Sequence, residues 1–202
     1  MNSRLVEANN HYFSPLPTTS FKQFEIIYTV KKQKFVAKTA NGVFSYKRLD
    51  LGTRVLLDYI IKHCNLAGKT IFDFGCGWGA ISQVLSRFCI DGKFFYTDIN
   101  QRALQLARDN LSKYFNCYEL KSLMTFDIII ANPPIKSGKK VFYQFTQKAL
   151  EYIKSDGQII YVIHKNLGAD SFLKQFNQIQ QIFNATKLSS AKGYRIITLR
   201  QF

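Results

Sequence analysis

The tripeptide Asn132-Pro133-Pro134 combines residue types that suit the binding of an amine. It follows the apolar run FDIIIA and precedes the basic segment IKSGKK. Proline fixes φ and has no N–H, and the residue before a proline is disfavoured in helical conformations. The tripeptide is therefore a stiff elbow whose acceptors, the Asn132 side-chain oxygen and the Pro133 carbonyl, can bind both N–H groups of a flat exocyclic amine. The alternative is a strand that simply ends at prolines.

The glycine-rich segment DFGCGWGA is a second candidate site. Gly75, Gly77 and Gly79 lie between a predicted strand and a predicted helix, where a missing Cβ permits a tight turn and lets a ligand approach the helix N-terminus. The same string fits the dinucleotide fingerprint, and a purely structural turn is the alternative. Asp73, inside the end of the strand, and the third glycine distinguish the segment from that fingerprint.

Asp98, in the segment FFYTDIN, is a third candidate. A carboxylate at the end of the second strand of such a fold can accept both hydroxyls of a ribose. An Asp is also a common helix N-cap, but Asn100 lies closer to the predicted helix start. We therefore favour a ribose-binding role for Asp98.

These candidates lie along a repeated strand–helix pattern, which predicts an α/β fold with a doubly wound, mostly parallel, Rossmann-like sheet. Ligands bind outside the carboxyl ends of the strands in such sheets, which is where the three candidate segments lie. The last two strands are only a few residues apart and can pair only as an antiparallel hairpin. Strands are predicted at 70–74, 93–99, 117–121, 126–131 and 158–164 and within 187–200; helices are predicted at 51–64, 80–88, 101–115, 141–154 and 170–183.

The chain is long enough for one sizeable core, with 202 residues of which 47% are hydrophobic. We expect an N-terminal extension over residues 1–48, with a β-hairpin formed by FEIIYTV, KKQ and KFVAKTA, and a main domain over 49–202. The 28 Lys and Arg against 13 Asp and Glu give a net charge of +15, which favours a polyanionic partner. Compositional drift explains the excess of Lys over Arg but not the scarcity of acids.

The four cysteines have neither C-x-x-C spacing nor a His at ligand spacing, so we expect no metal site and no disulfide framework. The N-terminus lacks the apolar core of a signal peptide, and the apolar runs are too short to span a membrane. We expect a cytoplasmic monomer without a membrane partner. We expect Trp78 to pack against the core or a cofactor, His63 to lie on a helix surface, and His164 to face the pocket.

Taken together, these motifs resemble the class I S-adenosylmethionine-dependent methyltransferases, and most closely the RsmC-like branch of small-domain methyltransferases that modify guanine N2 in small-subunit ribosomal RNA. The resemblance covers nearly the whole chain, through HYFS, NGVFSYKRLDLGTRVLL, FDFGCGWGAI, YTDIN, NPPIKSGKKV and GYRIITL. It implies S-adenosylmethionine as cofactor, ribosomal RNA or the small ribosomal subunit as partner, and a base-amine pocket at Asn132, Pro133 and Pro134. It implies cofactor contacts by Asp73, Gly75, Cys76, Gly77, Gly79, Asp98, Ile99 and Asn132, with Phe44 and Ser45 as a lid.

Three features depart from the family pattern. The segment CYELKSLMTF offers no Asp to contact the adenine amine, and Ser122 is the nearest polar candidate; the connection to the next strand is also too short for the usual helix. Ile135 stands where many such enzymes place an aromatic that stacks on the target base. The chain has the length of one copy of the fold, whereas some RsmC-like proteins have two.

The proposed reaction is direct methyl transfer to an amine, in which positioning matters more than proton abstraction. Ile135, Lys136, Lys139 and Lys140 would contact the RNA beside a flipped nucleotide, and the hairpin lysines Lys31, Lys32, Lys34 and Lys38 could extend that track; a solvated loop is the alternative. Adenine N6 or a release-factor glutamine would suit the same elbow. A nicotinamide oxidoreductase leaves the elbow unexplained, and a non-catalytic RNA-binding module would not need it.

Overall fold

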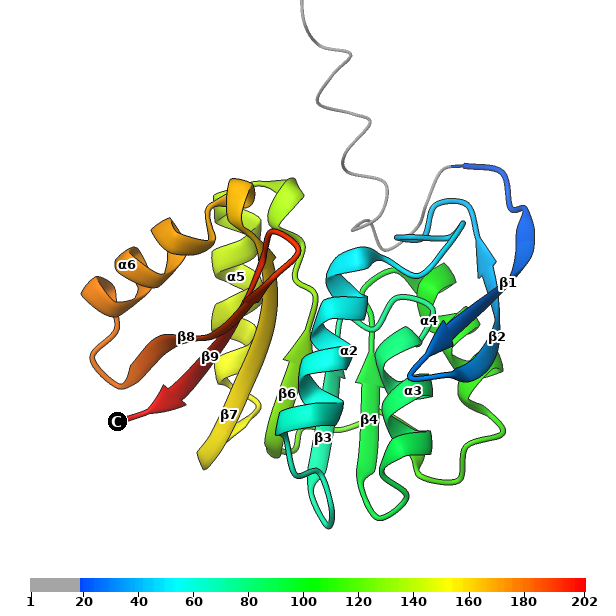
Figure 1. Cartoon of the computed structure of the whole chain (residues 1–202), viewed down its shortest axis with the longest axis horizontal. Coiled ribbons are helices and arrows are strands. Elements are labelled where there is room, and N and C mark those ends of the chain that lie inside the picture. Colours follow the sequence, from blue (N-terminus) through cyan, green and yellow to red (C-terminus); the bar gives the residue numbers. More distant parts are fainter. Residues whose placement is uncertain (1–18) are drawn as a thin grey trace, which may run out of the picture.

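The computed structural model describes residues 19–202, and its centre is a seven-stranded sheet (Figure 1). The strand order is β5-β4-β3-β6-β7-β9-β8; β3 to β7 run parallel, and β9 is antiparallel to both β7 and β8. The order reverses between β3 and β6, so a ligand-binding crevice is expected at the carboxyl ends of these two strands. The bounds are β3 Thr70–Phe74, β4 Lys93–Thr97, β5 Cys117–Glu119, β6 Phe126–Ala131, β7 Ile153–His164, β8 Phe183–Ala191 and β9 Tyr194–Gln201.

Helices cover both faces of the sheet, and this explains the uninterrupted apolar runs of its parallel strands. Successive residues of a strand point to opposite faces: Ile128 packs with the helices of one side, and Ile129 with those of the other. The first layer holds α2 (Leu51–His63), α3 (Ala80–Phe88) and α4 (Gln101–Leu111), and the second holds α5 (Lys139–Leu150) and α6 (Ala169–Ile179). The predicted fold class is therefore confirmed.

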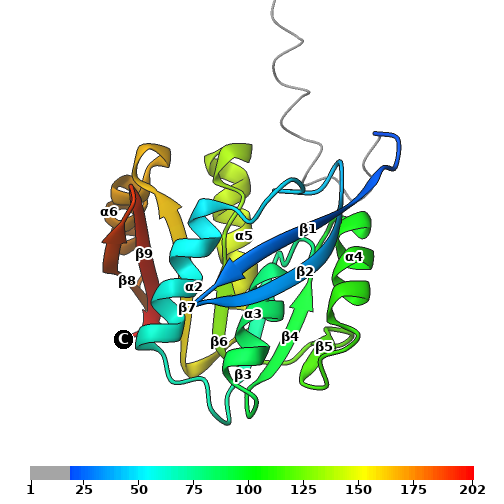
Figure 2. The same cartoon turned by 45° about the vertical axis from the view of Figure 1, so that its right-hand side comes forward.

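A separate two-stranded hairpin lies over the first helical layer. It is formed by β1 (Gln23–Val30) and β2 (Gln33–Ala40), as predicted, and runs across α3 from α4 to α2 (Figure 2). The buried Tyr28 hydroxyl donates to Gln83 Oε1 of α3 at 2.5 Å, and Trp78 packs edge-on against the Tyr28 ring. Trp78 is 3% exposed, so its predicted place in the core is confirmed. The domain boundary at residue 48 stays a prediction.

Several element ends differ from the predicted ones. Helix α5 begins at Lys139 and not at 141, because Gly138, with φ of 102°, ends a 3-10 turn (Ile135–Ser137) and its carbonyl accepts from Phe142 at 3.1 Å. It ends at Leu150 and not at 154, because β7 already begins at Ile153, where it pairs with Phe126 before a register shift. Helices α4 and α6 end about one turn early, at Leu111 and Ile179, and the remainder of the predicted last helix belongs to the connection to β8 and to β8 itself.

The sequence also made predictions about the link after β5, an N-terminal motif and membrane spans. Residues 120–125, between β5 and β6, contain no helix, as their short length indicated. The motif HYFS lies outside the described residues. Within residues 19–202 no helix has the length and hydropathy needed to cross a membrane.

Candidate active site

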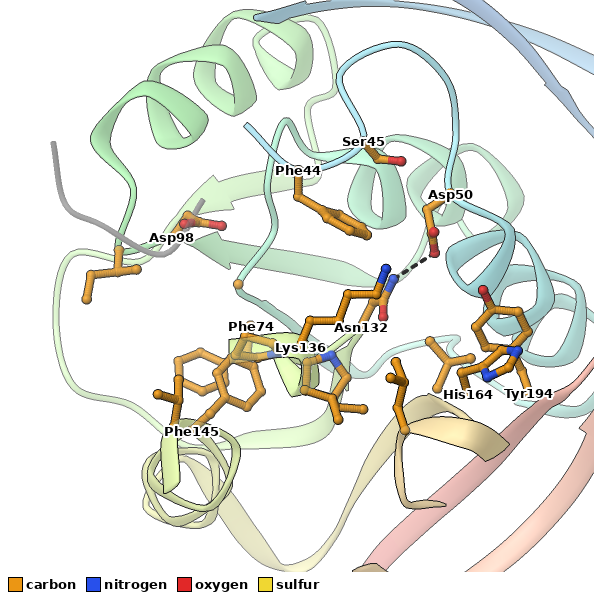
Figure 3. A pocket seen from close by; sticks show the side chains of 18 of the residues that line it. Phe44, Ser45, Asp50, Phe74, Asp98, Asn132, Lys136, Phe145, His164 and Tyr194 are labelled. Carbon is orange, nitrogen blue, oxygen red and sulfur yellow. Dashed lines mark hydrogen bonds between the residues drawn. The ribbon is translucent and has the colours of Figure 1, made fainter. Parts of the chain in front are cut away.

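A cavity of about 970 Å³ opens at the carboxyl edge of the sheet, where the strand order reverses (Figure 3). Its walls come from the ends of β3, β4, β6 and β7 and the loops that follow them, from α5, from the start of β9, and from the segment that precedes α2. Ligand sites of small-molecule enzymes typically occupy roughly 300–1,000 Å³. The cavity is therefore large enough for a nucleoside-containing cofactor together with part of an acceptor.

The glycine loop after β3 has a backbone conformation that favours glycine. Gly75, Gly77 and Gly79 have φ of 74°, 58° and 89°, values that residues with a Cβ rarely adopt. The amides of Gly75 and Cys76 donate to the Thr97 carbonyl at 3.1 and 3.0 Å, which ties the loop to the end of β4. Gly75 lines the cavity, whereas Cys76, Gly77 and Gly79 do not.

Asp98 lies at the cavity wall and also fixes the glycine loop. Its Oδ2 accepts from the Gly77 amide at 2.8 Å, and its Oδ1 accepts from the Asn100 amide at 2.9 Å. Burial raises the pKa of this carboxyl, and the hydrogen bonds from the two backbone amides oppose that rise. Each carboxylate oxygen can accept more than one hydrogen bond, so Asp98 can still bind hydroxyls in the cavity. Asn100 caps α4 by accepting from Arg102 and Ala103, which confirms that it and not Asp98 is the N-cap.

Asp73 lies beneath the loop and not in the cavity wall. It is 1% exposed, and its Oδ2 accepts from the amide and the hydroxyl of Ser82 at 3.0 and 2.8 Å. Its Oδ1 is buried without a hydrogen-bond partner among the described residues. Burial raises the pKa of this carboxyl to about 7. Asp73 therefore fixes α3 against β3. Its predicted role at the cofactor would be indirect, through the position of the glycine loop.

The Asn132 amide is held in one orientation by two acceptors from α2. Its Nδ2 donates to Asp50 Oδ2 at 2.9 Å and to Thr53 Oγ1 at 3.0 Å. A carboxylate can only accept, so the NH2 group must face Asp50 and the amide oxygen is left for the cavity. Pro133 and Pro134 are buried and line the cavity with Asn132, so the structure brings the predicted elbow together.

The second predicted acceptor, the Pro133 carbonyl, already accepts one hydrogen bond. The Ile135 amide donates to it at 2.9 Å, and Pro134 between them has φ of −78° and ψ of 57°, close to an inverse γ-turn. A carbonyl oxygen has two lone pairs, so one remains for a ligand. The elbow is thus stiffened by its own turn as well as by its two prolines.

Asp50 is a cavity residue that sequence reasoning missed. It is the N-cap of α2, where its Oδ2 accepts from the Thr53 amide at 2.9 Å. An Asp directly before the helical pattern that begins at Leu51 is a recognisable N-cap signal in the sequence. Its contact with Asn132 spans 82 residues, and no local pattern could indicate that contact.

The remaining walls are mostly apolar and aromatic. Phe44 and Ser45, predicted as a lid, lie in the segment before α2 and line the cavity, and so do Ile99 and Ile135. Phe74 and Phe145 pack together with ring centroids 4.4 Å apart. His164, at the end of β7, faces the cavity as predicted and packs edge-on against Tyr194. His63 is exposed at the end of α2, also as predicted.

The predicted RNA-binding lysines are only partly brought together. Lys136 lines the cavity and reaches across it in front of Asn132 (Figure 3). Lys139 and Lys140 are exposed at the start of α5, outside the cavity lining. On the hairpin, Lys31 pairs with Asp58 of α2 at 3.3 Å, away from the cavity. Ser122, the candidate for adenine recognition, is exposed and does not line the cavity.

The sequence matches the model of the methyltransferase small domain over residues 34–198. The chain belongs to this family. It is therefore an S-adenosylmethionine-dependent methyltransferase, as the resemblance indicated. The family match begins inside the hairpin, at β2.

This small-domain methyltransferase has relatives of two lengths. It is 29% identical over 204 residues to the uncharacterized protein YbxB of Bacillus subtilis, covering 96% of this chain and 99% of that protein. It is 32% identical over 149 residues to the ribosomal RNA small subunit methyltransferase C of Buchnera aphidicola subsp. Baizongia pistaciae, covering 68% of this chain and 45% of that protein. The chain thus spans about half the length of its methyltransferase C relatives.

Solved structures show the same fold. The T. thermophilus 16S rRNA N2 methyltransferase RsmC, solved in complex with AdoMet and guanosine, has a TM-score of 0.75 at 18% identity over 92% of this chain and 52% of that chain. A ribosomal protein L11 methylase from Lactobacillus delbrueckii subsp. bulgaricus has a TM-score of 0.60 at 18% identity over 76% of this chain and 84% of that chain. Enzymes named for an RNA and for a protein acceptor share this fold, so the fold alone does not choose the acceptor.

The residues at the carboxyl edge fit S-adenosylmethionine. Asp98 presents a carboxylate at the cavity wall beside Gly75, which suits ribose hydroxyls, and Ile99 and Phe44 add apolar surface. Because hydrogen bonds already fix the glycine loop to the end of β4, the ligand does not have to order this part of the cavity wall. Among residues 19–202 no group of three or more His, Cys, Asp or Glu side chains could hold a metal ion.

Proposed function

We propose that this methyltransferase transfers a methyl group from S-adenosylmethionine to the exocyclic N2 amine of a guanine in small-subunit ribosomal RNA. The observation that carries the proposal is the orientation of Asn132. Its Nδ2 is engaged by Asp50 and Thr53, so its oxygen is the group left for the cavity, which Pro133 also lines. Two fixed acceptors suit a planar amine with two N–H groups.

When bound, S-adenosylmethionine would supply an electrophilic sulfonium methyl. The amine nitrogen would gain the methyl and give up one proton to solvent, and the electron pair of the broken C–S bond would stay with the thioether. Aromatic amines are weak nucleophiles because their lone pair is delocalised into the ring. If both N–H groups donate hydrogen bonds, one to Asn132 and one to Pro133, the lone pair of the amine nitrogen would be turned out of conjugation with the ring. The same acceptors stabilise the positive charge that develops on the nitrogen, without reorganisation during the reaction.

Charge and kinship support an RNA acceptor. The net charge of +15 favours a polyanion over a protein substrate, and Lys136 at the cavity could contact a phosphate. Several relatives are named for small-subunit ribosomal RNA, and the T. thermophilus structure is named for N2 methylation of that RNA. A guanine amine inside a stacked helix is out of reach, so the target base would be flipped or already unpaired.

The residues that would hold the cofactor are those of the glycine loop and the end of β4. We propose that Gly75 and Asp98 contact it directly and that Asp73, Cys76, Gly77 and Gly79 shape the loop. We propose that Phe44, Ser45 and Ile99 cover its nucleoside part.

The test is the variant Asn132→Ala, compared with Asn65→Ala on the exposed loop after α2. Asn132→Ala should leave the calorimetric affinity for S-adenosylmethionine unchanged and lower kcat by roughly 100-fold or more, the pattern for an interaction made with the acceptor in the transition state. Asn65→Ala should match the wild type in both measurements. An Asn132→Ala protein with wild-type turnover on small subunits would refute the role of the elbow.

A further inference from the structure

We infer that Asp50 is a specificity-determining residue that binds the N1–H of guanine next to the N2 amine held by Asn132. The inference rests on the proposed function, because it names the part of the target base that the same cavity selects. Asp50 lines the cavity, is only half-buried, and comes from a helix start far from Asn132 in sequence.

The two oxygens of Asp50 have different surroundings. Oδ2 accepts from the Thr53 amide and from Asn132 Nδ2, both at 2.9 Å. Oδ1 accepts no hydrogen bond from any residue between 19 and 202. One oxygen therefore fixes Asn132, and the other is left as an acceptor beside it. Figure 3 shows the two side chains facing each other at the cavity.

The position of the Asp50 carboxylate depends on Gly52. A Cβ on Gly52 would come within 2.7 Å of Tyr194 Cε1 and within 2.9 Å of Asp50 Oδ2. Contacts this short force neighbouring atoms to move, so any side chain at this position would displace the carboxylate or the ring. The start of α2 is thus shaped to keep Asp50 next to Asn132 and Tyr194.

A pair of neighbouring acceptors distinguishes guanine from adenine. The Watson–Crick edge of guanine carries the N1–H donor next to the two N2–H donors, whereas adenine carries its N6–H donors next to N1, which only accepts. Guanine would therefore donate to both Asn132 and Asp50. Adenine would place the N1 lone pair against the Asp50 carboxylate, which leaves two desolvated acceptors facing each other. The cavity would select guanine by this unfavourable contact as well as by the favourable one.

The experiment compares two nucleosides as inhibitors of small-subunit methylation. Guanosine and 2-aminopurine riboside both have the 2-amine, but only guanosine has an N1–H. The wild type should bind guanosine about tenfold or more tightly than 2-aminopurine riboside, the scale of one well-placed base contact. Asp50→Asn can keep its oxygen toward Thr53 and Asn132 while it places an NH2 where Oδ1 was, and it should lose or reverse that preference.

Two control variants separate recognition of the guanine N1–H from the effect of a lost negative charge and from the effect of a less firmly held Asn132. Asp58→Asn removes the same charge from the exposed side of α2, where Asp58 pairs with Lys31, and should leave the preference unchanged. Thr53→Val removes the second acceptor of Asn132 Nδ2 but keeps the Asp50 carboxylate. It should slow methylation with the nucleoside preference intact.

Two results would overturn the inference. If Asp50→Asn slows methylation but retains the wild-type preference, Asp50 only positions Asn132. If the wild type makes N2-methylguanosine yet shows no preference for guanosine, the N1–H is not recognised. A wild type that methylates no guanine amine is a different failure, because it removes the proposed function itself.

Discussion

The backbone amide of Gly77 donates to Asp98 Oδ2 at 2.8 Å. This bond joins the glycine loop after β3 to the carboxylate after β4, two motifs that lie 21 residues apart in the sequence. Because Asp98 also accepts from Asn100 at the start of α4, one side chain fixes the loop, the helix and the cavity wall. The proposed cofactor site is therefore largely formed before a ligand arrives.

The variant Asp98→Ala should weaken the binding of S-adenosylmethionine. Loss of hydrogen bonds to a charged group costs about 1.5–3 kcal/mol. The measurement is isothermal titration calorimetry, with Asp91→Ala on the exposed turn before β4 as control. Equal affinities of Asp98→Ala and the wild type would remove Asp98 from the cofactor site.

The variant Gly79→Ala should be more destabilising than Gly68→Ala. Both glycines have positive φ, of 89° and 68°, so both substitutions carry a backbone cost of about 1–2 kcal/mol. Only at Gly79 would the new Cβ also meet Leu111, at 3.1 Å, whereas nothing lies within 4 Å at Gly68. The overpacking should add about 1–3 kcal/mol. Urea unfolding of both variants measures the difference, and equal losses would contradict it.

Asp127 should contribute to stability at neutral pH but not in strong acid. Burial raises the pKa of this carboxyl, but hydrogen bonds from the Thr70 hydroxyl and amide and from Lys154 outweigh burial and lower it from 3.8 to about 2. A carboxyl with a depressed folded-state pKa stabilises the fold above its unfolded-state value, and that contribution is lost as the pH falls from about 4 to about 2.

The variant Asp127→Asn should therefore lose about 1–2 kcal/mol of unfolding free energy at pH 7, less than the full shift implies because solvent screens part of the interaction. At about pH 2 the difference from the wild type should be close to zero. Asp156→Asn, at an exposed position near the start of β7, is the control. A constant difference across this pH range would contradict the assignment.

The lysines after the elbow should contribute to RNA binding through phosphate contacts. Replacing Lys136, Lys139 and Lys140 together by Ala should weaken binding to small subunits at low salt. It should also reduce the slope of log affinity against log salt by roughly 0.7–0.9 for each phosphate that the variant no longer neutralises. The measurement is a filter-binding titration at several salt concentrations.

The matched control replaces three exposed lysines at the opposite, amino edge of the sheet: Lys62, Lys69 and Lys93. Both triple variants lower the net charge equally. If both reduce the slope to the same extent, binding is set by total charge and not by the surface beside the cavity.

Much of the fold was predictable because strong local signals agree with the topology. The bounds of β3, α3 and β6 match the predicted ones. The two strands are apolar runs followed by Gly75 and by Asn132-Pro133, and α3 is an amphipathic segment that starts directly after Gly79. The start of β7 was not predictable, because residues 153–157 become a strand only through pairing with β6 across an irregular register.

The site was predictable only where one segment carries the chemistry. The Asn132 elbow and the Asp98 carboxylate follow directly from their position after strands. The buried place of Asp73 and the contact of Asp50 with Asn132 depend on packing between distant segments. Such contacts leave no periodic pattern in the sequence, so only the three-dimensional structure reveals them.

The most direct measurement of the acceptor is identification of the methylated product. Purified protein would be incubated with radiolabelled S-adenosylmethionine and, separately, unmodified small ribosomal subunits, naked ribosomal RNA, DNA and a release factor, and each product would be digested to nucleosides or amino acids. We predict label in N2-methylguanosine from small-subunit RNA, appearing roughly 100-fold or more slowly when Asn132 is replaced by Ala. Label in N6-methyladenosine or in methylglutamine would contradict transfer to a guanine amine.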